Sequence, residues 1–243
     1  MLGKRYIQLI REQLRIVEET QWEPITQAAK IIALSIKEGG LLHIFGCGHS
    51  HILAEEVFYR AGGLVPINPI LETSVMLHEG AVKSSMVERM QGYASIILNN
   101  YVTKPDEVII IISNSGINPI PIEMAMEAIK KRLKVIAITS SAYFQKPSRH
   151  PSGKKLYELA DIVIDNKLPY GDALIEIPKL EVKMAPGSTV VGAFILNILM
   201  TEVVEELIRL NVNPPIFVSG NIEGGFEQNQ KYIQQYRQRI KHL

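Results

Sequence analysis

The chain has 243 residues, a length that suits one large domain with additions and is enough to bury a substantial core. Hydrophobic residues make up 47% of the chain and charged residues 21%, and these ordinary globular values exclude wholesale disorder. The formal net charge of +1 argues against a nucleic-acid partner, because neutralising several phosphates needs a basic face. Any anion that the protein binds is therefore expected to be small.

Other features of the sequence bear on the cellular setting. Cys47 is the single cysteine, so an internal disulfide framework is excluded. Charged residues near the amino terminus stand where a secretory signal would need an apolar core. No run reaches the roughly 18 apolar residues that a membrane span requires. We therefore expect a cytoplasmic protein without a membrane partner.

Residues 1–40 are expected to form an amino-terminal helical segment. Apolar residues recur on one face from 2 to 38, and Pro24 is expected to interrupt or kink the helix. We interpret this amphipathic segment as packing across the domain or against a partner subunit. Two further units are expected after it, a ligand-binding domain at 41–212 and a carboxyl-terminal extension with a helix at 213–243.

A short apolar strand is expected at 41–45, and a glycine-rich turn after it opens a helix. G-x-G after a strand is part of the dinucleotide fingerprint, but His51 stands at the third glycine, and the acidic residue expected about 20 positions further on is at best Glu72. No nicotinamide cofactor is therefore expected. Ser50 at the helix entry instead suits a small phosphorylated or hydroxylated ligand.

The next strand is expected at 64–70, where Pro66 and Pro69 indicate a strand that is short or near an edge. A polar, helix-compatible insertion follows at 73–100, and connections of this length are often lids or binding loops. His78 in this insertion is a candidate for a contribution to a partner subunit's site. A solvated surface histidine is the alternative.

The most informative stretch begins with a β-branched run at 108–112, which ends at the Ser-Asn-Ser-Gly turn 113–116. A helical pattern and a second apolar run at 135–138 follow. Continuous β-branched runs predict strands covered on both faces, and so a parallel sheet with helices on either side. Ligands of such sheets bind beyond the carboxyl ends of the strands. Two hydroxyls and the amides of a turn entering a helix predict a phosphate site here, with an ordinary turn as the alternative.

The last third of the chain begins with polar and basic residues at 141–155, which predict a mobile loop. A final parallel strand is expected at 162–164, and a long connection follows it at the same edge. Ser188 and Thr189 then open a strongly apolar helix. Their hydroxyls are interpreted either as helix caps or as further ligand contacts.

These motifs resemble those of the sugar isomerase domain (SIS) family, which includes phosphoheptose isomerase, arabinose-5-phosphate isomerase and N-acetylmuramic acid 6-phosphate etherase. The shared elements are G-x-G-x-S, S-x-S-G and the opening of the last helix, here Gly46, Gly48, Ser50, Ser113, Ser115, Gly116 and 185–189. The chain most resembles the UPF0309 subgroup through GHSH, PILE, PYGDA and its NIEGG tail. The resemblance covers about residues 30–212. It implies a three-layer α/β fold with a flavodoxin-like five-stranded parallel sheet, a phosphosugar on the S-x-S loop, and a homodimer or homotetramer.

The chain departs from the family at its catalytic positions. Phosphoheptose isomerases and the etherases carry a glutamate ten residues after the first-loop serine, where this chain has Arg60. Arabinose-5-phosphate isomerases have a lysine just before that serine and a glutamate after S-x-S-G, where this chain has His49 and Ile117. The resemblance therefore carries over the phosphate site and leaves the base unassigned.

Aldose–ketose isomerisation moves a proton between adjacent carbons through an enediol, so it needs a base near the carbon and an acid near the carbonyl oxygen. The candidate catalytic residues are His49, His51, Glu72 and Asp172. The candidate substrate- and phosphate-binding residues are Gly48, Ser50, Ser113, Asn114, Ser115, Gly116, Ser188 and Thr189. No metal site is expected, because His49 and His51 lack a third ligand at matching spacing.

The leading hypothesis is a phosphosugar isomerase that works without a cofactor. A non-catalytic phosphosugar sensor is the first alternative, supported by the missing family bases. A phosphosugar lyase or etherase is the second, because these reactions also begin with proton abstraction next to a carbonyl.

Overall fold

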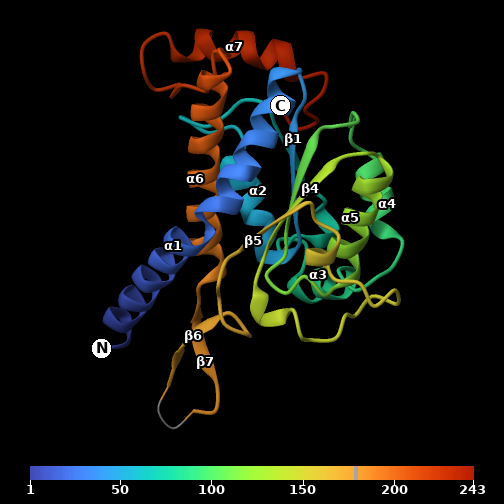
Figure 1. The fold of residues 1–243 in the computed structure, drawn as a ribbon, viewed down its shortest axis with the longest axis vertical. Coiled ribbons are helices and arrows are strands. Elements are labelled where there is room, and N and C mark those ends of the chain that lie inside the picture. The colour runs from blue at the N-terminus through green and yellow to red at the C-terminus, as the bar shows by residue number, and fades with distance from the viewer. Residues whose placement is uncertain (178–179) are drawn as a thin grey trace.

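The structure, a computed structural model, describes residues 1–177 and 180–243. Its centre is a five-stranded parallel sheet with the strand order β2-β1-β3-β4-β5 (Figure 1). The strands are β1 (Leu42–Gly46), β2 (Ile67–Ile70), β3 (Val108–Ile112), β4 (Lys134–Thr139) and β5 (Ile162–Asp165). The predicted sheet is confirmed, and β2, with Pro69 inside it, lies at an edge as expected.

The order of the strands places a switch point between β1 and β3. The chain continues from β1 outward to β2 at one edge, and from β3 outward through β4 to β5 at the other. Phe45 pairs in register with Ile70 on one side and with Ile111 on the other, so the ends of the three strands lie level. A crevice beyond the carboxyl ends at such a point is where open α/β sheets bind ligands.

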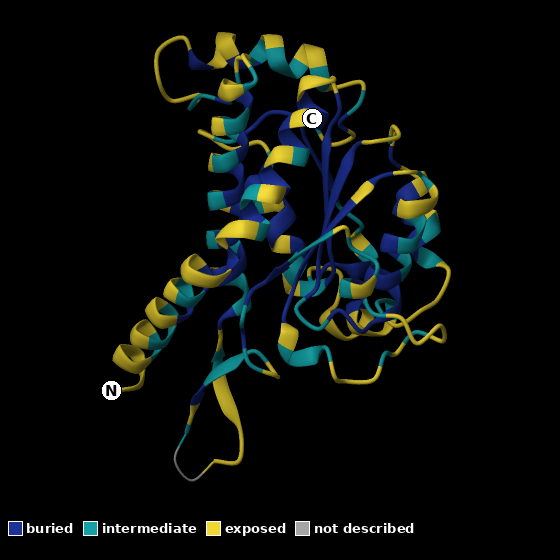
Figure 2. Cartoon of the chain, in the orientation of Figure 1, coloured by how far each residue is buried: buried dark blue, intermediate teal, exposed yellow. Residues whose placement is uncertain are grey.

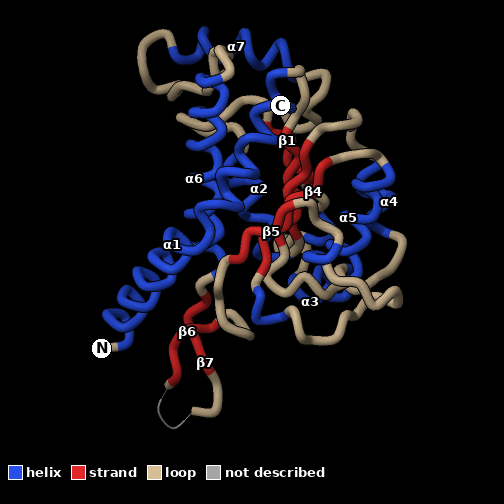
Figure 3. Tube along the Cα trace, in the orientation of Figure 1, coloured by secondary structure: helices blue, strands red, loops and turns tan. Residues whose placement is uncertain are grey.

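Helices cover both faces of the sheet, and Figure 3 shows the strands enclosed between them. Along each strand, alternate residues point to opposite faces, and each set forms its own apolar core. The buried strands stand out in Figure 2. One face packs against α1 (Leu2–Lys37), α2 (Ile52–Val57) and α6 (Ser188–Arg209). The other packs mainly against α4 (Tyr93–Asn99) and α5 (Pro119–Lys130), with α3 (Ala81–Val87) beyond the strand ends.

The helix α1 passes through Pro24 without ending, so, of the interruption or kink predicted there, the interruption is wrong. Proline has no N–H to donate to the carbonyl four residues earlier, which here belongs to Thr20. The side chain of Gln21 satisfies that carbonyl instead, because its Nε2 donates to Thr20 O at 2.8 Å. The helix continues because Ile25, Ile32 and neighbouring residues are fully buried against α6 and the sheet.

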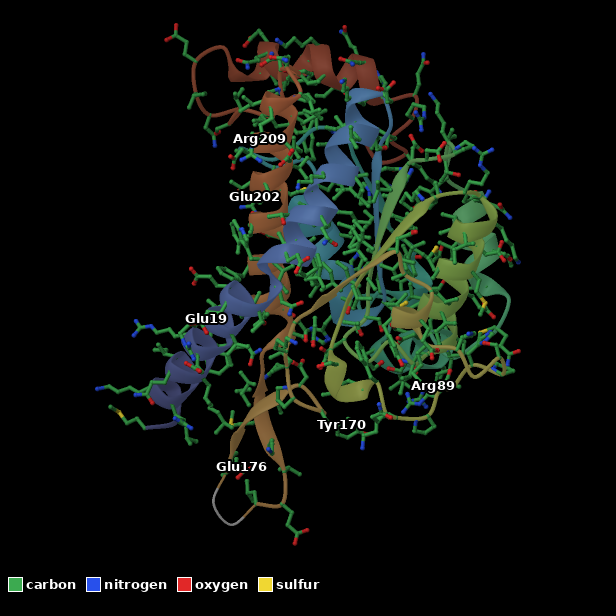
Figure 4. All side chains as sticks on the ribbon, in the orientation of Figure 1. Glu19, Arg89, Tyr170, Glu176, Glu202 and Arg209 are labelled. Atoms are coloured by element: carbon green, nitrogen blue, oxygen red, sulfur yellow. The ribbon has the colours of Figure 1, made fainter. Side chains whose placement is uncertain are left out.

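Two segments project from the α/β body at the carboxyl end of the sheet. One is the first half of α1, which carries Glu19, and the other is an antiparallel hairpin of β6 (Ala173–Glu176) and β7 (Lys183–Pro186), labelled at Glu176 in Figure 4. The Tyr6 hydroxyl donates to Pro186 O at 2.9 Å and ties them together. The sequence predicted only a long connection here. Within the described residues, no helix is long and apolar enough to span a bilayer.

The carboxyl-terminal extension closes the opposite, amino end of the sheet. It contains α7 (Gly225–Tyr236), followed by a tail that carries Arg239. Arg239 Nη2 lies 2.6 Å from Oε1 of the buried Glu107, whose other oxygen lies 2.9 Å from His43 Nε2. The last residues of the chain are thus bound to the first residues of β1 and β3.

Candidate functional site

A small pocket lies at the carboxyl edge of the sheet, where polar side chains from separate segments meet. They come from the turn after β1, the ends of β3 and β5, and the first turn of α6: His49, Ser50, Asn114, Asn166, Ser188 and Thr189. Apolar side chains and one glycine complete the wall: Leu53, Ile112, Ile138 and Gly192. The pocket therefore joins the two predicted loops with the opening of the last long helix.

Close backbone packing shapes the turn after β1. A 3₁₀ turn, Gly48–His51, leads directly into α2. Gly46 has no room for a side chain, because a Cβ there would lie 2.5 Å from the Ser50 carbonyl oxygen. Gly48 adopts a φ of +56°, in the left-handed region that favours glycine. The two glycines allow a tight turn that brings His49 and Ser50 to the pocket wall.

The second turn follows β3 and enters α5. The Ser113 hydroxyl accepts a hydrogen bond from Gly116 N at 3.1 Å, so this serine stabilises the turn and keeps its own proton available. Gly116 has a φ of +62°, and a Cβ on it would lie 3.0 Å from Thr139 Oγ1. The Ser115 hydroxyl is half-buried and has no hydrogen-bond partner within the described residues. The turn thus holds two serine hydroxyls, but the first turn of α5 offers few free amides, because Pro119 and Pro121 have no N–H and Ile120 N donates to Glu88 O at 3.2 Å.

An amide bridge links the ends of β3 and β5. Asn166 Nδ2 donates to Asn114 Oδ1 at 2.8 Å, and both residues line the pocket. The main-chain oxygen of Asn166 accepts a hydrogen bond from Gln13 on α1 at 2.9 Å. Asn166 was not among the predicted site residues. Its position directly after the strand 162–165, at the same edge as the two glycine turns, was the signal that could have found it.

Asp172 caps the helix α6. Its Oδ1 accepts hydrogen bonds from Gly187 N at 3.1 Å and from Ser188 N at 2.8 Å, and its Oδ2 accepts from the Ser188 hydroxyl at 2.6 Å. A carboxylate is stabilised at the positive end of a helix, so this arrangement holds the 166–172 connection against α6. Asp172 was predicted as a catalytic residue, and it lies beside the pocket in a capping role.

The two histidines of the first turn have different environments. His49 is exposed and is the ionisable side chain in the pocket lining. His51 is buried, and burial lowers its pKa although nearby Glu55 raises it. Glu55 Oε1 lies 3.0 Å from His51 Nε2, but the angle leaves this nitrogen without a hydrogen bond. Of the two, His49 is the one positioned to reach a ligand in the pocket.

Glu72 and His78 do not line this pocket. Glu72 follows the edge strand β2, and its Oε1 accepts hydrogen bonds from the hydroxyls of Ser74 at 2.7 Å and Tyr93 at 2.8 Å. Burial raises the pKa of Glu72, but these hydrogen bonds and the charge of Lys241 outweigh it, so the net shift is downward. His78 is exposed, with its ring centroid 6.5 Å from that of His51. A lowered pKa makes Glu72 a weaker base than an ordinary glutamate.

The chain is similar in sequence to known proteins. A SIS domain matches residues 5–140, which is more than half of the chain. A UPF0309 protein of Thermoanaerobacter pseudethanolicus is 50% identical over 243 residues, with 98% of each chain covered. The chain belongs to the SIS domain family, among the UPF0309 proteins.

Solved structures of SIS-fold proteins are more distant in sequence. Phosphoheptose isomerase from Neisseria gonorrhoeae has a TM-score of 0.52 and 18% identity, covering 87% of this chain and 99% of that one. The Vibrio vulnificus NanR protein complexed with ManNAc-6P has a TM-score of 0.50 and 13% identity, covering 97% of this chain and 69% of that one. At these identities the likeness concerns the fold alone.

The two positions at which the family resemblance implied a glutamate, 60 and 117, have structural roles in this chain. Arg60 forms an ion pair with Glu56 one helical turn before it, away from the pocket lining. Ile117 is buried, and its carbonyl accepts a hydrogen bond from Arg149 N at 2.9 Å. Within the described residues, no group of three His, Cys, Asp or Glu side chains is arranged to hold a metal ion. Neither position therefore places a carboxylate in the lining of the pocket.

Three polar side chains that were not predicted meet beside the start of α5. Asn118 directly precedes the helix, and its Nδ2 donates to Glu88 Oε1 at 2.9 Å. Its Oδ1 accepts from Arg149 Nη1 at 2.8 Å. Burial raises the pKa of Glu88, which the hydrogen bond from Asn118 and the charge of Arg149 offset only in part. No local pattern indicates this cluster, because its members come from three segments far apart in the chain.

Proposed function

We propose that this SIS-domain protein binds a phosphorylated sugar at the carboxyl edge of its sheet and interconverts its aldose and ketose forms. The observation that carries the proposal is the meeting of His49, Ser50, Asn114 and Ser188 in one pocket at the switch point of the sheet. The adjoining turn 113–116 supplies two serine hydroxyls for the phosphate.

The roles follow from the chemistry of each group. The sugar hydroxyls require neutral donors and acceptors, and the amides of Asn114 and Asn166 together with the hydroxyls of Ser50 and Thr189 supply both. His49 is the proposed proton-transfer group, because an imidazole can both accept and donate a proton and so can act as a base at carbon and as an acid at oxygen. Proton transfer then proceeds through an enediol without any cofactor.

We also propose that the protein works in the cytoplasm as a homodimer or homotetramer. The amino-terminal half of α1 and the β6–β7 hairpin project together from the body, and both expose apolar side chains, among them Ile7, Trp22 and Val182. Exposed apolar surface on a projecting arm is typical of contacts between subunits. His78 is proposed to contribute across such a contact.

The test is proton exchange at carbon. The protein is incubated in D₂O with phosphorylated pentoses, hexosamines, heptoses and muramic acid derivatives, and deuterium next to the carbonyl is followed by NMR. Incorporation with one member of the panel is expected, and His49→Gln is expected to reduce its rate about 10²- to 10⁴-fold while binding remains. His150→Gln, which alters a histidine paired with Glu123 outside the pocket, is the matched control.

A second function is a phosphosugar sensor without catalysis. The absence of the family glutamates at 60 and 117 favours it. Binding of a phosphosugar without any deuterium uptake would decide for the sensor and against the isomerase. Uptake accompanied by loss of a substituent would instead indicate a lyase or etherase.

A further inference from the structure

The loop 141–155 is attached to the turn that precedes α5. Arg149 N donates to Ile117 O at 2.9 Å, and Leu156 N donates to Gly116 O at 2.9 Å. These two hydrogen bonds fix both the middle of the loop and its end against the Ser-Asn-Ser-Gly turn. A loop that the composition predicted to be mobile is therefore fixed at Arg149, beside the proposed phosphate site.

The side chain of Arg149 is held by Asn118, which directly precedes the first residue of α5. Asn118 donates from Nδ2 to Glu88 and accepts at Oδ1 from Arg149 Nη1. A carboxylate only accepts and a guanidinium only donates, so the two partners determine which way the amide faces. Glu88, with its partly buried carboxyl group, thus orients Asn118, and Asn118 positions the guanidinium.

The charge of Arg149 has no direct counterion. In the part of the chain that the structure describes it forms no ion pair, whereas Arg15, Arg60 and Arg209 each pair with a glutamate. Glu88 is a carboxylate that acts on this charge, and it is linked to Arg149 only through Asn118. Arg149 is exposed, and its main chain is bound to Ile117, next to the turn that carries Ser113 and Ser115.

We propose that Arg149 is a binding residue for the phosphate group of the ligand, poised by Asn118 and Glu88. The proposal rests on the proposed function and deepens it, because a guanidinium that adds two parallel hydrogen bonds matches a phosphate monoester dianion. The ligand class is then a sugar phosphate, and neutral sugars bind far more weakly.

The experiment is titration calorimetry of the full chain with inorganic phosphate and with the phosphosugar panel, at constant ionic strength. The variants are Arg149→Gln, Arg149→Lys and the double variant Ser113→Ala/Ser115→Ala. Arg237→Gln is the matched control, since it removes the same charge from an exposed arginine beyond α7. We expect Arg149→Gln to weaken binding about ten- to a hundred-fold, Arg149→Lys to restore part of the affinity, and Arg237→Gln to leave it unchanged. Thermal denaturation in the absence of ligand verifies that each variant is folded.

The outcomes separate the two proposals. If the double serine variant loses binding while Arg149→Gln binds within two-fold of wild type, Arg149 is not a ligand contact and the phosphate site stands. If neither the serines nor Arg149 affect the binding of any phosphosugar, both proposals fail. Equal weakening by Arg149→Gln and Arg237→Gln would also overturn the role of Arg149, because the effect would then be one of net charge.

Discussion

The two ends of the sheet carry polar clusters of opposite character. At the amino end, Glu107 is almost fully buried and accepts hydrogen bonds from Leu41 N, Lys104 N, Arg239 and His43. At the carboxyl end, the polar part of the pocket lining consists of His49 and of neutral amides and hydroxyls. The charge of the first cluster is matched inside the protein, whereas the pocket has an exposed histidine, His49, in its lining. The difference supports the proposal that the amino end serves stability and the carboxyl end serves binding.

The substitution expected to have the largest effect is Glu107→Gln. Removing the negative charge leaves the Arg239 guanidinium without its counterion in a largely buried position, and such losses cost about 3–5 kcal/mol of stability. Urea denaturation followed by circular dichroism measures the change. Glu205→Gln, which breaks an exposed ion pair with Arg209, is the control and is expected to cost under about 1 kcal/mol. Equal losses in the two variants would contradict a stabilising role for the amino-end cluster.

Acid is expected to weaken the same cluster, because it protonates Glu107. Burial raises the pKa of Glu107, but hydrogen bonds from His43, Arg239 and Lys104 outweigh it and lower the pKa from 4.5 to about 2. A depressed carboxylate pKa adds stability above about pH 4.5 that is lost as the pH falls toward 2. Melting temperatures across this range should fall less steeply in Glu107→Gln than in wild type. Parallel curves for the two proteins would show that Glu107 is not the responsible group.

A smaller effect is expected at the carboxyl end from Asp172→Ala. This change removes the acceptor for Gly187 N, Ser188 N and the Ser188 hydroxyl, and the loss of a helix cap typically costs about 1 kcal/mol. Affinity for a phosphosugar is expected to change as well, since Ser188 lines the pocket. Denaturation and calorimetry on the same samples measure both. A loss of stability as large as that of Glu107→Gln would remove the contrast between the two ends.

Much of the fold followed from local patterns. The β-branched runs located β3 and β4, because a strand covered on both faces has no polar side to alternate with. The prolines marked β2 as an edge strand. The interruption expected at Pro24 does not occur. Proline leaves the carbonyl of Thr20 without a backbone donor, and the side chain of the neighbouring Gln21 supplies one instead.

The candidate site was predictable only in outline. The glycine turns identified His49, Ser50 and the 113–116 turn, because short motifs of this kind require particular backbone angles that the sequence records. The sequence did not indicate which residues these side chains would contact. Asn166 bonds Asn114 from the far side of β4, and Asp172 bonds Ser188 across a hairpin that no sequence pattern predicted.

The sequence by itself determined the parallel α/β class, the positions of the five strands of the parallel sheet and the two turns that bear hydroxyl groups, since each depends on neighbours within a few residues. Only the tertiary structure decided that Glu107 is neutralised by Arg239, that Asp172 caps α6, and that Arg149 lies at the start of α5. These contacts join residues 16 to 132 positions apart in the chain. Contacts between residues so far apart in the sequence depend on how the helices, loops and tail pack around the sheet, and no local preference of the chain encodes them.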